Sequence, residues 1–237
     1  MSYDKQQIID EFQEYYNHSF DAKTFYRDAK AYMNRRGNTK DTKEPYTEII
    51  ISLMFQLGII ERLKKEITTV RRDNNTYHVL SHFYDEFLKP HEKSTQKEKM
   101  IAKKLNGNTY EDIGHVLNYE VPLYGNNSDD GGEIDLFSYN EKKDTAFILE
   151  LKKPDAPDTL LRCIMEVYNY WSRVDRVKLL KDFSLSPDTS VTPAVLVFKD
   201  SVAANEYDSL YDRPNLKYLI ETMGIQVFIW PIDRAQY

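Results

Sequence analysis

The chain has 237 residues, 41% of them hydrophobic and 30% charged, which is enough for one large domain or two smaller ones with a buried core. Its longest apolar stretch, residues 49–60, is too short to span a bilayer, and no basic-then-apolar leader opens the sequence. The net charge of −6 argues against broad nonspecific adhesion to nucleic acid, and the single cysteine, Cys163, excludes an internal disulfide or a multi-cysteine metal cluster. We therefore expect a cytoplasmic protein without membrane contact.

Amphipathic helices are predicted at the start of the chain. Apolar residues recur at helical spacing near 4–16 and again near 23–35. A third helix begins after Pro45, a residue favoured in the first turn, and stops at Gly58. The stretch "EITTVRRDNNTYHVL" follows, with two β-prone runs joined by residues 73–75, which predicts a β-hairpin. A short helix with Phe83 and Phe87 is expected to end before Pro90.

Helices followed by a hairpin are the element order of a winged-helix module, so residues 1–90 are interpreted as a helical, winged-helix-like unit. Docking of nucleic acid is one function for it, with four basic residues near the wing: Lys64, Lys65, Arg71 and Arg72. The alternative is a small helical domain whose hairpin closes its core and whose basic residues are solvated surface. Small modules of this kind also serve as protein contacts.

The polar stretch 91–99 predicts a boundary, and a second domain is assigned to residues 94–237. Helices are expected near 95–106 and 157–174. Strands are expected near 116–123, 134–137, 145–151, 193–199 and 225–230. A mixture of α and β segments with a long crossover helix predicts an α/β fold, a central mixed sheet flanked by helices.

Three charged residues stand on two of these apolar strands. In "TAFILELKK" the side chains alternate, so Glu150 and Lys152 project from one face, about 7 Å apart along the strand. Asp135 lies on the preceding strand, and polar residues 139–144 make the two strands an antiparallel pair. This pairing is expected to bring Asp135 beside Glu150.

Two converging carboxylates are costly when both are ionised and unpaired, and a hard divalent cation relieves that cost. Oxygen ligands without dense nitrogen or sulfur favour Mg²⁺ or Mn²⁺. A lysine beside such an ion can hold or deprotonate the attacking water, or steady the developing phosphate charge. The set Asp135, Glu150 and Lys152 is therefore suited to phosphodiester hydrolysis.

The sequence here resembles the PD-(D/E)XK nuclease superfamily, which includes restriction endonucleases and RecB-type nuclease domains. The resemblance rests on Gly132-Glu133-Ile134-Asp135, on the 15-residue step to Glu150, and on Glu150-Leu151-Lys152, and it covers residues 94–232. It implies a restriction-endonuclease-like core in which Asp135 and Glu150 bind Mg²⁺ or Mn²⁺. The main-chain carbonyl of Leu151 would complete the coordination, and Lys152 would assist the water. Ile134 departs from the proline of the name motif.

The resemblance also suggests further site residues. Members tend to carry an upstream acid, for which Glu98 on the predicted helix is one candidate and Glu120 on a neighbouring strand another. RecB-type members carry Gln-x-x-x-Tyr on the following helix, where this chain has Glu166 and Tyr170. Tyr170 matches and Glu166 does not. Arg162, Glu166, Tyr170 and Arg173 form a polar stripe at helical spacing, which is interpreted as a substrate-binding face in which Arg162 or Arg173 pairs with Glu166.

The first interpretation is a metal-dependent nuclease acting on nucleic acid, with DNA favoured over RNA. The rival is a noncatalytic nucleic-acid- or protein-binding module on a nuclease-like fold, in which Asp135, Glu150 and Lys152 form only a structural ion pair. A transcriptional regulator led by residues 1–90 is a third interpretation. The sequence leaves open a homodimer or a complex with another protein, as well as endonuclease or exonuclease action.

Overall fold

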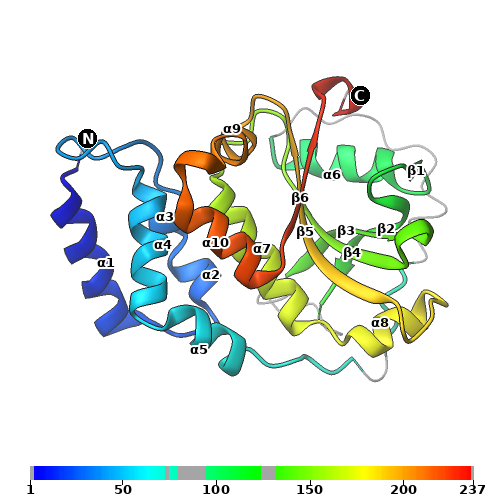
Figure 1. The fold of residues 1–237 in the computed structure, drawn as a ribbon. Helices are drawn as coiled ribbons and strands as arrows, with labels where there is room; N and C mark the ends of the chain where they lie inside the picture. Colours follow the sequence, from blue (N-terminus) through cyan, green and yellow to red (C-terminus); the bar gives the residue numbers. More distant parts are fainter. Residues whose placement is uncertain (1–2, 73–74, 80–93, 124–131, 236–237) are drawn as a thin grey trace.

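The computed structural model describes residues 3–72, 75–79, 94–123 and 132–235 (Figure 1). Helices form the N-terminal part, and a six-stranded mixed sheet with helices on both faces follows, so the fold is α/β. Among these residues, no helix combines the length and the apolar character needed to cross a bilayer.

The N-terminal helices are α1 (Lys5–Ser19), α2 (Phe25–Asp28), α3 (Lys30–Met33), α4 (Tyr46–Gln56) and α5 (Ile59–Glu66). The helix predicted near 23–35 is interrupted at Ala29, which lies between α2 and α3. Gly58 adopts a left-handed conformation with φ of 66°, which favours glycine and lets the chain turn between α4 and α5. The first and third predicted helices are confirmed, whereas α5 was not predicted.

The predicted β-hairpin is wrong for the part of the segment that the structure describes. Residues 67–72 and 75–79 contain no strand. Arg72 explains part of the difference, because its guanidinium donates to the carbonyls of Thr76 and Pro122 and lies over the Tyr77 ring. These contacts hold the segment against the sheet domain instead of forming a wing. The centre of the predicted turn and the helix with Phe83 and Phe87 lie outside the described residues.

The sheet has the strand order β1-β2-β3-β4-β5-β6. Its strands are β1 (Thr109–Tyr110), β2 (Gly114–Pro122), β3 (Glu133–Asn140), β4 (Thr145–Leu151), β5 (Ser190–Phe198) and β6 (Gln226–Trp230). The first four strands are antiparallel neighbours, and β5 and β6 continue parallel to β4. A short 3-10 turn, Glu141–Lys143, joins β3 to β4, as the polar loop predicted.

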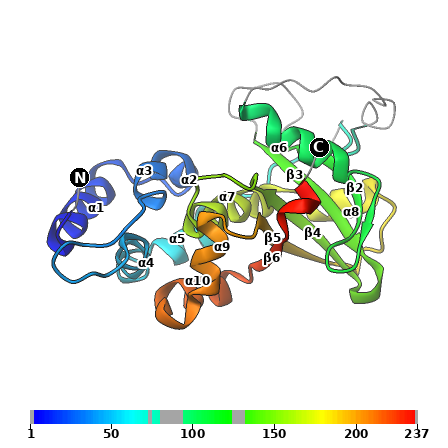
Figure 2. The ribbon, with the colours of Figure 1, turned by 90° about the horizontal axis from the view of Figure 1, so that it is seen from above.

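The connections to the parallel strands contain α7 (Leu160–Arg173), α8 (Arg176–Asp182), α9 (Val202–Asp208) and α10 (Pro214–Met223). Two further 3-10 turns are Leu210–Asp212 and Ile232–Ala235. Helix α6 (Ser94–Leu105) precedes the sheet. Seen from above in Figure 2, α6 lies on one side of the sheet, and α7 with the N-terminal helices lies on the other.

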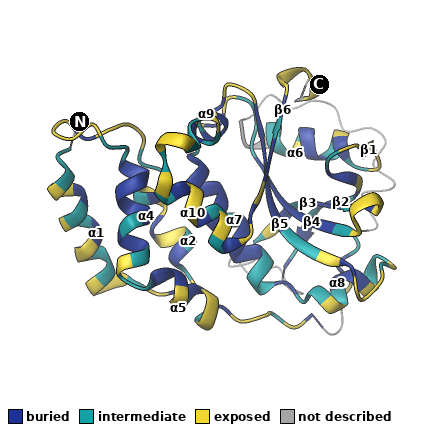
Figure 3. Cartoon of the chain, in the orientation of Figure 1, coloured by how far each residue is buried: buried dark blue, intermediate teal, exposed yellow. Residues whose placement is uncertain are grey.

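The alternation predicted for β4 is confirmed by the two hydrophobic cores. Phe147, Leu149 and Leu151 pack with α6, whereas Ala146 and Ile148 pack on the α7 side. The core on the α7 side extends without a break into α1 and α4, and Figure 3 shows both the sheet and α7 largely buried. The helices α1 and α4 therefore share one buried core with the unit assigned to residues 94–237. Within that unit, α7 lies in this core together with one face of the sheet.

Buried carboxylates at helix N-termini strengthen this packing. Glu48 on α4 accepts hydrogen bonds of 2.9 Å from the backbone amides of Asn215 and Leu216, at the start of α10. Glu206 accepts from the amide of Leu160, the first residue of α7, at 2.6 Å and pairs with Arg213. An acid at a helix N-terminus satisfies amides that lack an intrahelical partner. These contacts fix the positions of α7 and α10 relative to the rest of the protein.

Candidate active site

The three charged residues of the predicted site lie at the ends of β3 and β4. Leu136 is paired with Leu149 in the antiparallel register, so Asp135 and Glu150 are the next residues on the two strands. Leu136 packs with α6 whereas Phe137 packs on the α7 side, which places Asp135, by alternation, on the α7 face. Glu150 follows Ile148 on that same face. The predicted convergence of Asp135 and Glu150 on one face is therefore observed.

Lys152 forms the centre of an ion-pair network on this face. Its amine contacts Oε1 of Glu150 and lies 3.4 Å from Oε2 of Glu166 on α7. The exposed fractions of the three side chains are 12%, 3% and 14%, so the network has little access to water. Charge pairs removed from water interact more strongly than surface pairs because less solvent screens them.

Helix α7 supplies the second side of the network. Arg162 donates to Oε1 of Glu166 at 2.9 Å, and the Tyr170 hydroxyl donates to the same oxygen at 3.3 Å. The predicted pairing of Glu166 with Arg162 is thus observed. Arg173 instead donates to Asn169 and to the carbonyl of Lys23. Glu166 joins α7 to Lys152, which follows β4.

Burial is the largest influence on the pKa values of Asp135 and Glu150. It raises the pKa of Asp135 to about 7, against the lowering effects of Lys152 and of the hydrogen bond from the Leu151 amide. It also raises the pKa of Glu150 well above the usual range, and Asp135 and Glu166 add to this effect. Without an added cation, the face therefore cannot hold all of its carboxyl groups ionised at neutral pH.

The pKa values of Lys152 and Glu166 shift in the directions expected for a cation and an anion in contact. Burial alone lowers the pKa of Lys152, but Glu150, Glu166 and Asp135 raise it well above its ordinary value. Burial raises the pKa of Glu166, yet Lys152 and Arg162 together bring it below the usual range. Lys152 is consequently a protonated ammonium in this arrangement, and Glu166 is a carboxylate.

The two candidates for the upstream acid differ in position. Glu98 on α6 accepts a hydrogen bond of 3.2 Å from the Lys153 amide, and its charge contributes to the raised pKa of Asp135. Glu120 instead forms a 2.6 Å ion pair with Lys99. Its backbone has φ of 45°, a left-handed conformation that interrupts the alternation of β2. The structure therefore brings Glu98 toward the site and directs Glu120 to Lys99.

The polar stripe of α7 differs from its prediction as an open substrate-binding face. Arg162 and Tyr170 are 5% and 7% exposed. The N-terminal helices explain this burial, because Arg162 donates to the carbonyl of Tyr26 and the Tyr26 ring packs edge-on against Tyr170. Arg162 and Tyr170 therefore position Glu166. Tyr26 was missed, since no local pattern in residues 1–90 indicates contact with a helix about 140 residues away.

Two observations bear on whether the site can bind a metal ion, and they point in opposite directions. Among the described residues, no group of three or more His, Cys, Asp or Glu side chains is arranged to hold an ion. However, Oε2 of Glu150 is buried and has no hydrogen-bond partner in the described part of the chain. A buried carboxylate oxygen without a partner is a favourable position for a cation. Asp135 and Glu150 are therefore the residues whose donor atoms fit one.

Comparison of the chain with protein-family models, curated proteins and solved structures gives no match.

Proposed function

We propose that the protein is a metal-dependent nuclease that hydrolyses phosphodiester bonds of DNA, with RNA as the second substrate class. The observation that carries the proposal is the convergence of Asp135, Glu150 and Lys152 on one buried face, at the ends of two paired strands. The mixed sheet with helices on both faces is also the architecture that the PD-(D/E)XK resemblance implies, and a restriction-endonuclease-like core is part of the proposal.

The charge of the site supports a divalent cation. Four acids contribute to its electrostatics, namely Asp135, Glu150, Glu166 and Glu98, against the two cations Lys152 and Arg162. With every acid ionised, the site carries two negative charges in excess, which one Mg²⁺ or Mn²⁺ would neutralise. Asp135 and Glu150 would bind the ion, with the carbonyl of Leu151 as a further oxygen ligand. When bound, the ion would polarise the phosphate and lower the pKa of a coordinated water.

Lys152 has two roles in this proposal. Its ammonium is the cation paired with Glu150, and it shares Glu166 with Arg162. Once Glu150 has another positive partner, the amine can donate to the attacking water or to the phosphate oxygen that gains charge. Glu166 and Arg162 then hold the amine on the side of α7.

A noncatalytic interaction module is the second candidate, and one observation favours it. Lys152, Glu150, Glu166 and Arg162 already form a connected ion-pair network in the metal-free protein. Such a network can be purely structural. Retention of Asp135, which lies beside this network and has its own hydrogen bond from Leu151, favours the enzyme.

A panel of labelled single- and double-stranded DNA and RNA incubated with Mn²⁺ tests the function directly. Cleavage by the wild-type protein and not by Asp135→Asn is expected, together with calorimetric binding of Mn²⁺ that the variant lacks. Lys217→Gln, an exposed change on α10, is the control and should cleave normally. Absence of both cleavage and Mn²⁺ binding would reject the nuclease and support the interaction module.

A further inference from the structure

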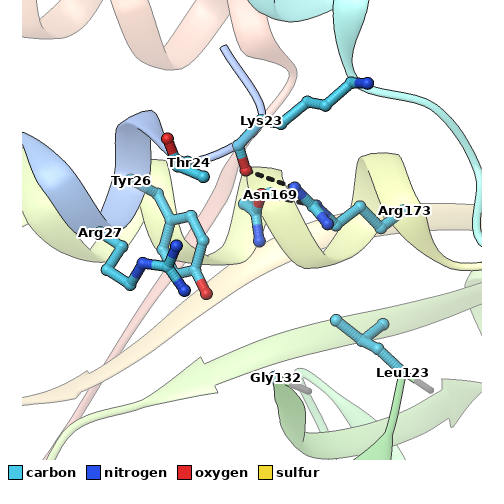
Figure 4. A pocket seen from close by; sticks show the side chains of 8 residues that line it. All are labelled: Lys23, Thr24, Tyr26, Arg27, Leu123, Gly132, Asn169 and Arg173. Atoms are coloured by element: carbon cyan, nitrogen blue, oxygen red, sulfur yellow. Dashed lines mark hydrogen bonds between the residues drawn. The ribbon is translucent and has the colours of Figure 1, made fainter. Parts of the chain in front are cut away.

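A pocket of about 170 Å³ lies between α2, α7 and the two residues Leu123 and Gly132, which follow β2 and precede β3 (Figure 4). Its lining residues are Lys23, Thr24, Tyr26, Arg27, Leu123, Gly132, Asn169 and Arg173. A hydrogen bond of 3.0 Å from the Leu123 amide to the Gly132 carbonyl holds its lower wall together. The pocket is separate from the carboxylates described above, and the proposed function assigns it no role.

The polar groups of this pocket are mainly hydrogen-bond donors. Figure 4 shows the guanidinium groups of Arg27 and Arg173, the Tyr26 hydroxyl and the amide of Asn169 gathered around it, while the Lys23 amine points away. Asn169 is only 3% exposed, and its Oδ1 accepts from Nε of Arg173 at 2.9 Å. This contact turns the amide nitrogen of Asn169 away from Arg173.

Three basic residues, Lys23, Arg27 and Arg173, are among the described residues that line the pocket. Asp28 lies 3.5 Å from Arg27 at the surface, where both side chains are largely solvated. No acidic residue lines the pocket among the described residues. Two guanidinium groups with amide and hydroxyl donors are a set that matches phosphate oxygens, because arginine presents several N–H groups in a fixed plane.

Tyr26 connects this pocket to the acidic face. Its ring packs against Tyr170 and its carbonyl accepts from Arg162, both of which contact Glu166. Gly132, which lines the pocket, also lies against Tyr170. A Cβ atom added at Gly132 would be 2.6 Å from the Tyr170 ring. Gly132 also precedes Asp135 by three residues, roughly 10 Å of extended chain.

We infer that this pocket binds a phosphate group of the nucleic-acid strand, close to the bond held at Asp135, Glu150 and Lys152. This inference rests on the proposed function and adds a positioning site to it. A cationic pocket beside the carboxyl groups supplies attraction for the strand that does not depend on a metal. The phosphate can be an internal diester or a terminal monoester, since both present the same oxygens.

Fluorescence anisotropy tests the inference with a labelled DNA 20-mer, in the absence of metal and in the Asp135→Asn background. Arg27 is exposed, so Arg27→Gln should leave the fold intact. We expect about tenfold weaker binding at low salt, with the salt slope of the affinity reduced by about one. Lys217→Gln removes the same charge from α10 and should bind as the parent does. A circular dichroism melt checks that each variant is folded.

Two comparisons separate the outcomes. Oligonucleotides with a 5′-phosphate, with a 3′-phosphate or with neither identify the source of the phosphate. If Arg27→Gln weakens the binding of one phosphorylated oligonucleotide more than the others, a terminal monoester occupies the pocket. Equal weakening for all three places an internal diester there. Unchanged affinity in Arg27→Gln, or equal weakening in Lys217→Gln, would overturn the inference. Because binding is measured without metal or cleavage, that result would leave the nuclease assay of the wild-type protein unaffected.

Discussion

The backbone amide of Leu151 donates a hydrogen bond of 2.7 Å to Oδ2 of Asp135. This contact ties the side chain of β3 to the main chain of β4 at the point where the strand ends. It leaves Oδ1 as the second Asp135 oxygen and holds the carboxyl group on the face that carries Glu150. The orientation of Asp135 is therefore set by the sheet before any ligand binds, as expected for a preorganised site.

Replacing Asp135 by asparagine should remove activity and stabilise the metal-free protein at neutral pH. Burial raises the pKa of Asp135 from 3.8 to about 7, so the folded state holds a proton that the unfolded state has lost between these values. Stability from this group is thus complete below the unfolded pKa and is lost as pH rises through about 7. The melting temperature of Asp135→Asn minus that of wild type should grow from pH 4 to pH 8. A constant difference would contradict this assignment.

Glu166→Gln should shift the pH dependence of Mn²⁺ binding to lower pH. Glu166 is one of the charges that raise the pKa of Glu150, so its neutralisation lets Glu150 ionise at lower pH. Calorimetric affinities measured from pH 5 to pH 8 give the profile, and cleavage should be equal to wild type or faster. Glu120→Gln removes an acid that is paired with Lys99 and serves as the control. A large loss of activity in Glu166→Gln would make Glu166 itself a ligand.

Lys152→Met should destabilise the protein measured without metal by about 3 kcal/mol and abolish cleavage, because it removes the cation that Glu150 contacts and leaves Glu166 paired with Arg162 alone. Urea denaturation measures the loss. The double variant Lys152→Met/Glu166→Gln should recover part of the stability and none of the activity. If the single variant is as stable as wild type, the ion pair contributes nothing to folding.

Two substitutions of Tyr170 distinguish the contribution of its buried ring from that of its hydroxyl hydrogen bond. Tyr170→Ala should lose about 3 kcal/mol or more, since it empties a buried site under Gly132. Tyr170→Phe keeps the ring and removes only the hydroxyl that donates to Glu166, so we expect a loss of about 1 kcal/mol and unchanged Mn²⁺ affinity. Thermal melts and calorimetry on both variants provide the measurements. Equal losses in the two variants would show that the hydroxyl, not the ring, matters.

Arg72 and Arg71 should differ, although both are basic residues of the predicted wing. Arg72 is 7% exposed and donates to the carbonyls of Thr76 and Pro122, so Arg72→Gln should lower the free energy of unfolding by about 2 kcal/mol. Arg71 is exposed, and Arg71→Gln should change stability by less than about 0.5 kcal/mol. Urea titrations compare them. Similar stability of both variants would mean that the buried contacts of Arg72 are unimportant.

The sequence by itself determined the features that depend on local order. Alternation along "TAFILELKK" placed Glu150 on one face, because side chains of a strand point to opposite sides in turn. The short polar loop made β3 and β4 antiparallel neighbours, so Asp135 came beside Glu150. Helical spacing on α7 likewise predicted that Arg162 could reach Glu166, four residues later. Each of these inferences spans few residues or one simple turn.

Only the tertiary structure decided which groups meet across long separations. A single helix cannot reveal what packs on its polar stripe, and in the structure Arg162 of α7 donates to the carbonyl of Tyr26 on α2. Intrinsic preference also failed in residues 67–72 and 75–79, the described part of a β-prone segment, which contain no strand. Arg72 is held there by the distant carbonyl of Pro122. Glu98 and Glu120 could not be ranked from sequence, since their side-chain directions depend on α6 and on the left-handed backbone of Glu120. Long-range packing overrides local preference in all three cases, because burial and hydrogen bonding outweigh small differences in propensity.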